Sequence, residues 1–315
     1  MLSTTAAVAQ QPPRGTFNLL IENDKFTGTD RHYTNGVQLS YLSGKDRVPR
    51  WLRNTARYLP GIQTTAALRT GYVLGHSIFT PDDITTAEPL PDERPYAGWL
   101  YGGVALVAET ENRLDTWELD LGIVGPSARG EEVQNSFHRL IGVNEANGWD
   151  NQLKDEFGYA LIYERKWRNL WEHRRTGFGL DLIPHIGGSL GNVGTYLDLG
   201  ATLRIGNDLP NDFGAPRIRP SLPGSNFFLP RDNFGWYLFA GVSGRAVAYT
   251  IFLDGNTIKN SLSVDREPLV GDLQAGLVTN LGWARLAYTY VYRTREFKGQ
   301  EEPDHFGSIG LSVKF

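Results

Sequence analysis

The segment Glu22–Gly36, ENDKFTGTDRHYTNG, concentrates side chains that could bind a metal ion. Its polar and ionisable members are Glu22, Asn23, Asp24, Asp30, His32 and Thr34. Oxygen donors of this kind suit Ca²⁺, which takes about 6–8 carboxylate, carbonyl and water oxygens. A structural zinc site is disfavoured, because the sequence has no cysteine and its histidines are scattered. A solvated hairpin loop with Asx turns explains the same residues, and Asn35-Gly36 fits that alternative equally well.

A second candidate group lies on a predicted amphipathic helix, Glu131–Gly142 (EEVQNSFHRLIG). Its early acidic residues, its apolar residues at helical spacing and the glycine that ends it are typical of a helix. The apolar positions are Val133, Phe137, Leu140 and Ile141. Gln134 and His138, four residues apart, share the opposite stripe, with Glu145 close in sequence. His138 is therefore a candidate general base that takes a proton from water near neutral pH.

Three other features of the sequence carry less functional information. No Gly-x-Ser-x-Gly elbow occurs, so a serine esterase lacks its usual signature. The other five histidines have no acid–base partner at fixed spacing and are interpreted as structural. We interpret a set of charged residues on predicted strands as a network that stiffens a barrel interior. This set comprises Glu118, Asp120, Asp181, Asp198, Arg204, Arg245 and Arg285.

The elements that must position these residues are β-strands, because apolar and polar residues alternate along most of the chain. In Phe306–Phe315, for example, Ile309, Leu311 and Val313 alternate with polar or small residues, and the last strand ends on an aromatic, as in bacterial outer-membrane proteins. Twelve such segments are present: 16–23, 33–43, 69–79, 98–110, 113–124, 156–167, 176–188, 193–205, 234–250, 267–281, 282–295 and 306–315. No stretch approaches the roughly 18 apolar residues of a spanning helix. The pattern predicts an all-β fold, a transmembrane antiparallel β-barrel of about 12 strands.

Connection lengths give a first expectation for the two ends of the barrel. The connections at 110–113 and 280–283 are tight, whereas 44–68, 80–97, 125–155, 206–233 and 251–266 are long. Short turns are expected in the periplasm and long loops outside the cell, which places the predicted helix in an extracellular loop.

The rest of the chain bounds the domain and its partners. Residues 1–15, with Ala-Val-Ala before Gln10, are expected to be a residual signal-like or disordered N-terminus, and 16–315 a single transmembrane barrel domain. The net charge of −4, without a basic face, indicates no nucleic-acid partner.

Three sequence blocks, taken in order, resemble the lipid A 3′-O-deacylase family of outer-membrane enzymes. They are ENDKFTGTDRHYTNGVQLSY, RPYAGWLYGG and VGPSARGEEVQNSFHRLIG…GWDNQLKDE, and the resemblance runs from Phe17 to Phe315. It implies a twelve-stranded barrel in the bacterial outer membrane, with an active site between the barrel wall and a helix of an extracellular loop. The implied partners are lipid A of lipopolysaccharide and other outer-membrane lipids, and the implied oligomeric state is a monomer.

Carried over position by position, the resemblance assigns candidate roles. His138 would be the base that activates water, with Gln134 beside it. Asn23 and Asp24 would hold a Ca²⁺ ion that stabilises the oxyanion, and Thr34 would be a further, substrate-binding position of the site.

The sequence departs from the family pattern at two positions. The acid expected six residues after the histidine is Asn144 here, so Glu145 is expected to support His138 instead. A family lysine aligns with Thr86, and Arg94 is the nearest cation, so we expect Arg94 to contact substrate phosphate.

The function predicted from the sequence is a calcium-dependent carboxylic ester hydrolase that removes the 3′-linked acyloxyacyl chain of lipid A. Two alternatives remain open at this point. One is an outer-membrane esterase that acts on phospholipid. The other is a barrel or pore of the same fold that lacks catalytic activity.

Overall fold

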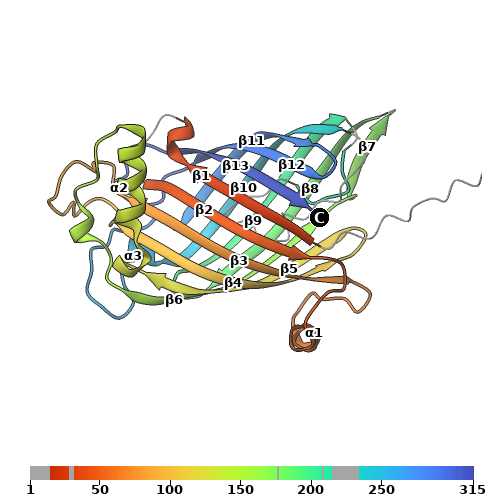
Figure 1. The fold of residues 1–315 in the computed structure, drawn as a ribbon, viewed down its shortest axis with the longest axis horizontal. Coiled ribbons are helices and arrows are strands. Elements are labelled where there is room, and N and C mark those ends of the chain that lie inside the picture. The colour runs from red at the N-terminus through yellow and green to blue at the C-terminus, as the bar shows by residue number, and fades with distance from the viewer. Residues whose placement is uncertain (1–14, 28–31, 176, 208, 215–233) are drawn as a thin grey trace, which may run out of the picture.

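The strands predicted from alternation form one continuous wall (Figure 1). The computed structural model describes residues 15–27, 32–175, 177–207, 209–214 and 234–315. The strands are β1 (Gly15–Asn23), β2 (His32–Ser43), β3 (Ala67–Thr80), β4 (Ala97–Glu109), β5 (Arg113–Val124), β6 (Glu156–Trp167), β7 (Trp171–Arg175), β8 (Phe178–Leu190), β9 (Gly194–Asn207), β10 (Gly235–Thr250), β11 (Leu269–Asn280), β12 (Ala284–Arg293) and β13 (Asp304–Lys314). The predicted N-terminal segment 1–15 lies outside the described residues except for Gly15.

Helical segments occupy the connections. The α-helices are α1 (Arg50–Thr55), α2 (Gly130–Ile141) and α3 (Ile251–Asp254), and the 3₁₀ turns are η1 (Asp24–Thr27), η2 (Ala56–Tyr58), η3 (Pro126–Ala128) and η4 (Trp149–Asn151). The predicted helix is thus present as α2, shifted by one residue, whereas α1 and α3 were not predicted. Among the described residues, no helix is both long and apolar enough to cross a membrane.

Each strand pairs antiparallel with its neighbours, and the pairing of β6 with β8 closes the sheet. β6 and β7 both pair along β8, β6 with its end at His185–Leu190 and β7 with its start at Phe178–Leu182. They are therefore two pieces of one wall strand, and the described chain forms a closed barrel of twelve strands, as predicted. Closure leaves no sheet edge for lipid to cover, which is required of a β-structure that crosses a membrane.

Side chains alternate between the two faces of the wall. On β9, the apolar residues Leu197, Leu199 and Leu203 are exposed on the outer face, whereas Asp198 and Arg204 are buried inside. This is the arrangement of a barrel whose outer band faces lipid.

The interior at the end that carries the C-terminus is filled. Asp212 and Phe213, from the connection after β9, are fully buried there, and Asp212 pairs with Arg204 and with Arg285 at 2.8 Å. Arg204 also binds Asp181 at 2.6 Å. The predicted interior charge network is therefore real at these positions, and the filled lumen argues against an open pore.

The expectation that all long connections lie at one end is wrong. Connections 44–68 and 206–233 leave and return at the end with the chain termini, and Figure 1 shows α1 at the opposite end from α2. At the α2 end, only three residues join β8 to β9. Strand parity fixes the end at which a connection lies, whatever its length. Because barrels of this class keep both termini in the periplasm, the α2 end faces outward from the cell.

Candidate active site

On the outer face of β3 and β4, the side chains change from exposed to buried towards the α2 end. Leu74 and Leu100, on the outer face, are 55% and 38% exposed. Further along the same face, Ile78 is fully buried, and its cross-strand partner is Gly98. Ile78 packs in a cluster with Trp149 and Ala146, from the segment that follows α2. This part of the outer wall is thus covered by protein.

A pair of glycines lets α2 approach the wall closely. A Cβ atom on Gly98 would lie 3.1–3.3 Å from atoms of Ala128 and Gly130. A Cβ atom on Gly130 would lie 2.5 Å from the Trp149 ring. His76 lies two residues before Ile78 on the same face of β3. Its Nε2 is 2.8 Å from the carbonyl oxygen of Ala128. The start of α2 is therefore fixed on the outer face of β3 and β4.

The orientation of the His138 ring is set by the chain that follows α2. Gly142 ends the helix with a φ of 73°, and the chain turns back along it. The carbonyl oxygen of Asn144 then lies 2.6 Å from Nδ1 of His138, whose side chain is almost completely buried. A carbonyl only accepts hydrogen bonds, so Nδ1 carries the proton, and Nε2 is the basic nitrogen of the neutral ring.

Asn135 holds this returning segment. Its side-chain amide donates to the Ala146 carbonyl at 3.3 Å, and its Oδ1 accepts from the Ala146 N–H at 2.8 Å. Asn135 is buried on α2, three residues before His138. The two bonds fix Ala146, and with it the Asn144 carbonyl that orients the imidazole.

Gln134 presents a hydrogen-bond donor on the face of α2 that carries His138. Its Oε1 accepts a bond of 2.8 Å from the indole N–H of Trp149. Because an indole N–H only donates, this bond assigns Oε1 to the side of Trp149. The amide Nε2 of Gln134 therefore lies on the side away from the indole. Nε2 is buried and has no hydrogen-bond partner among the described residues. Gln134 precedes His138 by one helical turn, so a base and an N–H donor share one face of α2.

The Glu145 carboxylate, expected to support His138, lies at the protein surface. It forms an ion pair of 3.1 Å with Arg139 of α2. The residue that meets Nδ1 is Asn144, through its main-chain carbonyl. The carbonyl is a neutral acceptor, so it orients the ring without adding a negative charge.

Asn23, Asp24 and Thr34 are buried where β1 ends and β2 begins, with residues 28–31 outside the described part of the chain. Asn23 is the neighbour of Glu22, which lines the barrel interior, so alternation directs Asn23 to the outer face. Thr34 lies at a bulge between β2 and β3, and its hydroxyl is 2.7 Å from that of Thr80. Figure 1 shows η1 and α2 at the same end of the barrel.

The donor set at this end of β1 fits calcium by its chemistry. Among the described residues, no group of three or more His, Cys, Asp or Glu side chains could hold a metal ion. A cation here would take the Asp24 carboxylate together with amide, main-chain or water oxygens. Ca²⁺ accepts such neutral oxygen ligands readily.

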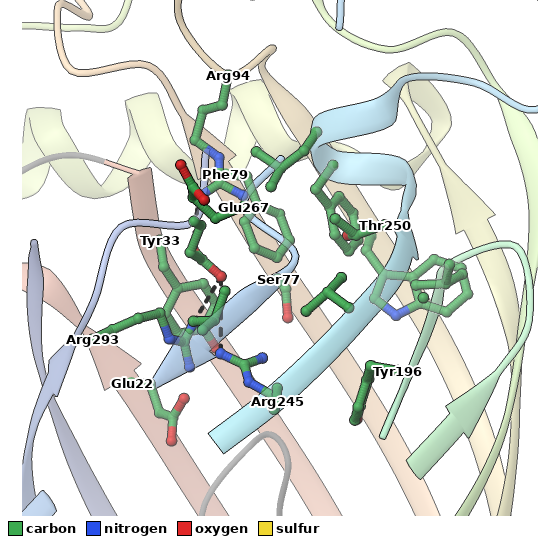
Figure 2. A pocket seen from close by; sticks show the side chains of 18 residues that line it. Glu22, Tyr33, Ser77, Phe79, Arg94, Tyr196, Arg245, Thr250, Glu267 and Arg293 are labelled. Atoms are coloured by element: carbon green, nitrogen blue, oxygen red, sulfur yellow. Dashed lines mark hydrogen bonds and ion pairs between the residues drawn. The ribbon is translucent and has the colours of Figure 1, made fainter. Parts of the chain in front are cut away.

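Arg94 lies in a different place from the one expected. Its guanidinium pairs with Glu296 at 3.3 Å and lies 4.9 Å from the ring centre of Phe79. Figure 2 shows Arg94, Arg245 and Arg293 reaching into the same pocket, which is inside the barrel. Because Phe79 faces inward and its neighbour Ile78 outward, the wall separates this pocket from the covered outer face. The structure thus does not place the guanidinium beside His138.

The inner pocket is electrically balanced. Its lining includes three arginines, Arg94, Arg245 and Arg293, and three glutamates, Glu22, Glu267 and Glu296. Burial alone would raise the pKa of Glu296, but the three guanidiniums lower it below its usual value. The group is therefore ionised and neutralised locally, as in a network that stiffens the barrel.

Four residues that position the site lie outside the set predicted from the sequence: Asn135, Trp149, Gly98 and Gly130. Asn135 was within the predicted helix, and a polar residue next to Gln134 was the only available signal. The roles of Gly98 and Gly130 depend on a contact between segments distant in sequence, so no local pattern could reveal them.

The fold and this covered site define an outer-membrane β-barrel with a helix packed on the outside of its wall. The model of the family "Outer membrane protein LpxR" matches residues 1–315. The chain therefore belongs to the LpxR family, the lipid A deacylases of the outer membrane, and the bacterial outer membrane is its location.

One solved structure supports the family fold, and another shows only a weaker similarity. LpxR from Salmonella typhimurium is similar with a TM-score of 0.78 and 20% identity, over 95% of this chain and 100% of that chain. The beta domain of the Bordetella autotransporter Brka gives a TM-score of 0.45 and 12% identity, over 96% of this chain and 100% of that chain. No curated protein matches the chain.

Proposed function

We propose that this protein hydrolyses the ester that links the 3′ acyloxyacyl chain to lipid A, with His138 as the base that activates water. The observation that carries this proposal is the bond between Nδ1 of His138 and the carbonyl oxygen of Asn144. It keeps Nε2 of the neutral ring able to accept a proton, which is the requirement for a general base.

The reaction follows from the groups on α2. Nε2 of His138 takes a proton from water as the water oxygen adds to the ester carbonyl carbon. The bond between that carbon and the sugar oxygen then breaks, and the imidazolium returns the proton to the sugar oxygen. The products are a fatty acid and a free 3′ hydroxyl, so a protein nucleophile is not required.

The developing negative charge on the carbonyl oxygen needs donors. The Nε2 amide of Gln134 is held in one orientation by Trp149 and can donate to this oxygen. Such a preorganised donor stabilises a transition state by about 3–4 kcal/mol when it is aimed at the oxyanion.

Asn23 and Asp24 would hold a calcium ion, with Thr34 nearby as a further position of the site. When bound, the ion would polarise the ester carbonyl and neutralise the oxyanion. Both side chains are buried at the end of β1, so their oxygens are held in place rather than free in solvent.

Mass spectrometry of lipids after incubation with the detergent-folded protein tests the substrate. We expect lipid A to lose one acyloxyacyl unit while phosphatidylethanolamine in the same micelles stays intact. Loss of acyl chains from the phospholipid alone would make the protein a phospholipid esterase. Intact lipid A and intact phospholipid would contradict hydrolysis of either lipid.

A further inference from the structure

The polarity of α2 is inverted relative to a helix that packs on a soluble core. Its buried residues are Gly130, Gln134, Asn135 and His138, and three of these are polar. Its apolar stripe is exposed: Leu140 at 81%, Val133 at 43%, Phe137 at 42% and Ile141 at 42%. Soluble proteins rarely expose a contiguous apolar surface of this kind, so its presence marks a contact site.

We infer that α2 lies in the outer leaflet of the membrane, with this apolar stripe in contact with lipid acyl chains. The stripe comprises Val133, Phe137, Leu140 and Ile141. The inference deepens the proposed function, because it states how the substrate chain reaches the site, and only that consequence rests on the proposed function.

The arrangement of side chains around α2 sets its orientation. At about 100° per residue, the apolar stripe lies on one side of the buried face and the charged residues Glu132 and Arg139 lie on the other. Both charged side chains are exposed. A helix that packs sideways on the wall can therefore direct its apolar stripe towards the membrane and its charges towards water. This is the arrangement of helices that lie in a membrane interface.

The lipid-facing wall identifies the occupant. α2 packs on β3 and β4, whose outer residues Leu74 and Leu100 are exposed towards lipid. Leu119 and Leu121 continue the exposed apolar surface on the neighbouring strand, β5. The apolar stripe of α2 extends this surface at its outer end, so the acyl chains that cover the wall also reach the helix.

This placement has a consequence for the substrate. His138 and Gln134 lie on the face of α2 next to the apolar stripe, between the helix and the wall. An acyl chain that lies along the stripe has its ester end near the polar boundary of the leaflet. The lipid can thus reach the base from the membrane without leaving it.

Fluorescence quenching measures the depth of α2 directly. The chain has no cysteine, so single cysteines can be labelled with NBD without other changes. Leu140→Cys probes the apolar stripe, and Arg139→Cys is the matched control on the charged side of the same helix. In phosphatidylcholine vesicles that contain doxyl-labelled lipid, we expect strong quenching at position 140 and weak quenching at position 139, with iodide giving the reverse order.

Two results of this experiment would overturn the inference. Equal quenching of both labels by iodide would place the apolar stripe in water. Protection of position 140 that increases with the protein-to-lipid ratio would assign the stripe to a contact with a second copy of the chain.

A second measurement addresses catalysis. Leu140→Glu should lower lipid A hydrolysis in vesicles about tenfold, because the charge must be kept out of the acyl region. In detergent micelles the same variant should remain within about twofold of the unchanged protein, because it leaves Gln134 and His138 in place. Ile258→Glu places the same charge on an exposed apolar residue of another loop at this end and should have little effect in either medium. Equal losses in vesicles and micelles would contradict a membrane role for Leu140. If the protein without any substitution hydrolyses no lipid A in either medium, only the proposed function is refuted.

Discussion

Nδ1 of His138 lies 2.6 Å from the main-chain carbonyl oxygen of Asn144, the residue at which the family pattern has an acid. The carbonyl performs the orienting part of that role. It fixes the tautomer in which Nε2 is basic, and it does so through a segment that Asn135 holds with two further hydrogen bonds. Main-chain geometry thus positions the imidazole at Nδ1.

Asn135→Ala should slow hydrolysis about 10²-fold, because the loss of both bonds to Ala146 releases the carbonyl that orients His138. Rates with lipid A in detergent micelles measure this, and a shift of the pH–rate profile would separate a change in His138 from a general loss of structure. Ser136→Ala, at an exposed position next to it on α2, is the control. Equal rates in the unchanged protein and Asn135→Ala would mean that the Ala146 bonds do not position the base.

Glu145→Gln should have little effect on the rate, because the carboxylate pairs with Arg139 at the surface. An exposed ion pair of this kind contributes about 0–1 kcal/mol to stability. The rate of lipid A hydrolysis in detergent micelles measures this effect. A large loss of activity would return Glu145 to the role of supporting acid that the sequence suggested.

Trp149→Phe should reduce the rate while keeping most of the ring packing, because Gln134 loses the N–H that fixes its amide. Removal of an oriented donor costs about 10²–10³ in rate when the donor binds the oxyanion, and Gln134→Ala should show this larger effect. Trp117→Phe removes an indole N–H that bonds to the Pro60 carbonyl at the other end of the barrel, and serves as the control. Full activity of Gln134→Ala would remove the amide from the mechanism.

The strand pattern could be predicted because alternation is a local property and a barrel wall repeats it in every strand. The faces of α2 could be predicted for the same reason, and Gln134 and His138 do share one. What covers each face of α2 could not be predicted, because helical periodicity does not say whether the apolar stripe contacts protein or lipid. Arg94 was misplaced because its partner, Glu296, is 202 residues away in sequence.

Asp24→Ala should abolish most of the activity, and millimolar Ca²⁺ should restore part of it, because one lost carboxylate weakens a site built from several oxygens. Chelation with EGTA should have the same effect on the unchanged protein. Asp265→Ala, at an exposed carboxylate paired with Lys298, is the control. A chelator-insensitive protein whose Asp24→Ala variant keeps its rate would leave His138 to act with protein donors alone.

Gly98→Val should inactivate the protein without unfolding the barrel, because its side chain would push the start of α2 off the wall. Gly102→Val is a matched control on the same face of β4, where an added Cβ meets only the Val73 carbonyl oxygen, at 3.8 Å. Both variants should keep the heat-dependent gel mobility of a closed barrel. Normal activity of Gly98→Val would show that close packing of α2 is not required.

The most direct test of the account is the product analysis of lipid A incubated with the unchanged protein and with His138→Ala. Both should migrate as folded barrels in unboiled gels, because α2 lies outside the strand ladder. We predict that the unchanged protein releases one acyloxyacyl unit, and that His138→Ala is slower by about 10²–10⁴-fold, the usual contribution of a general base. A folded His138→Ala protein that releases this unit at the unchanged rate would contradict the central claim that His138 activates water.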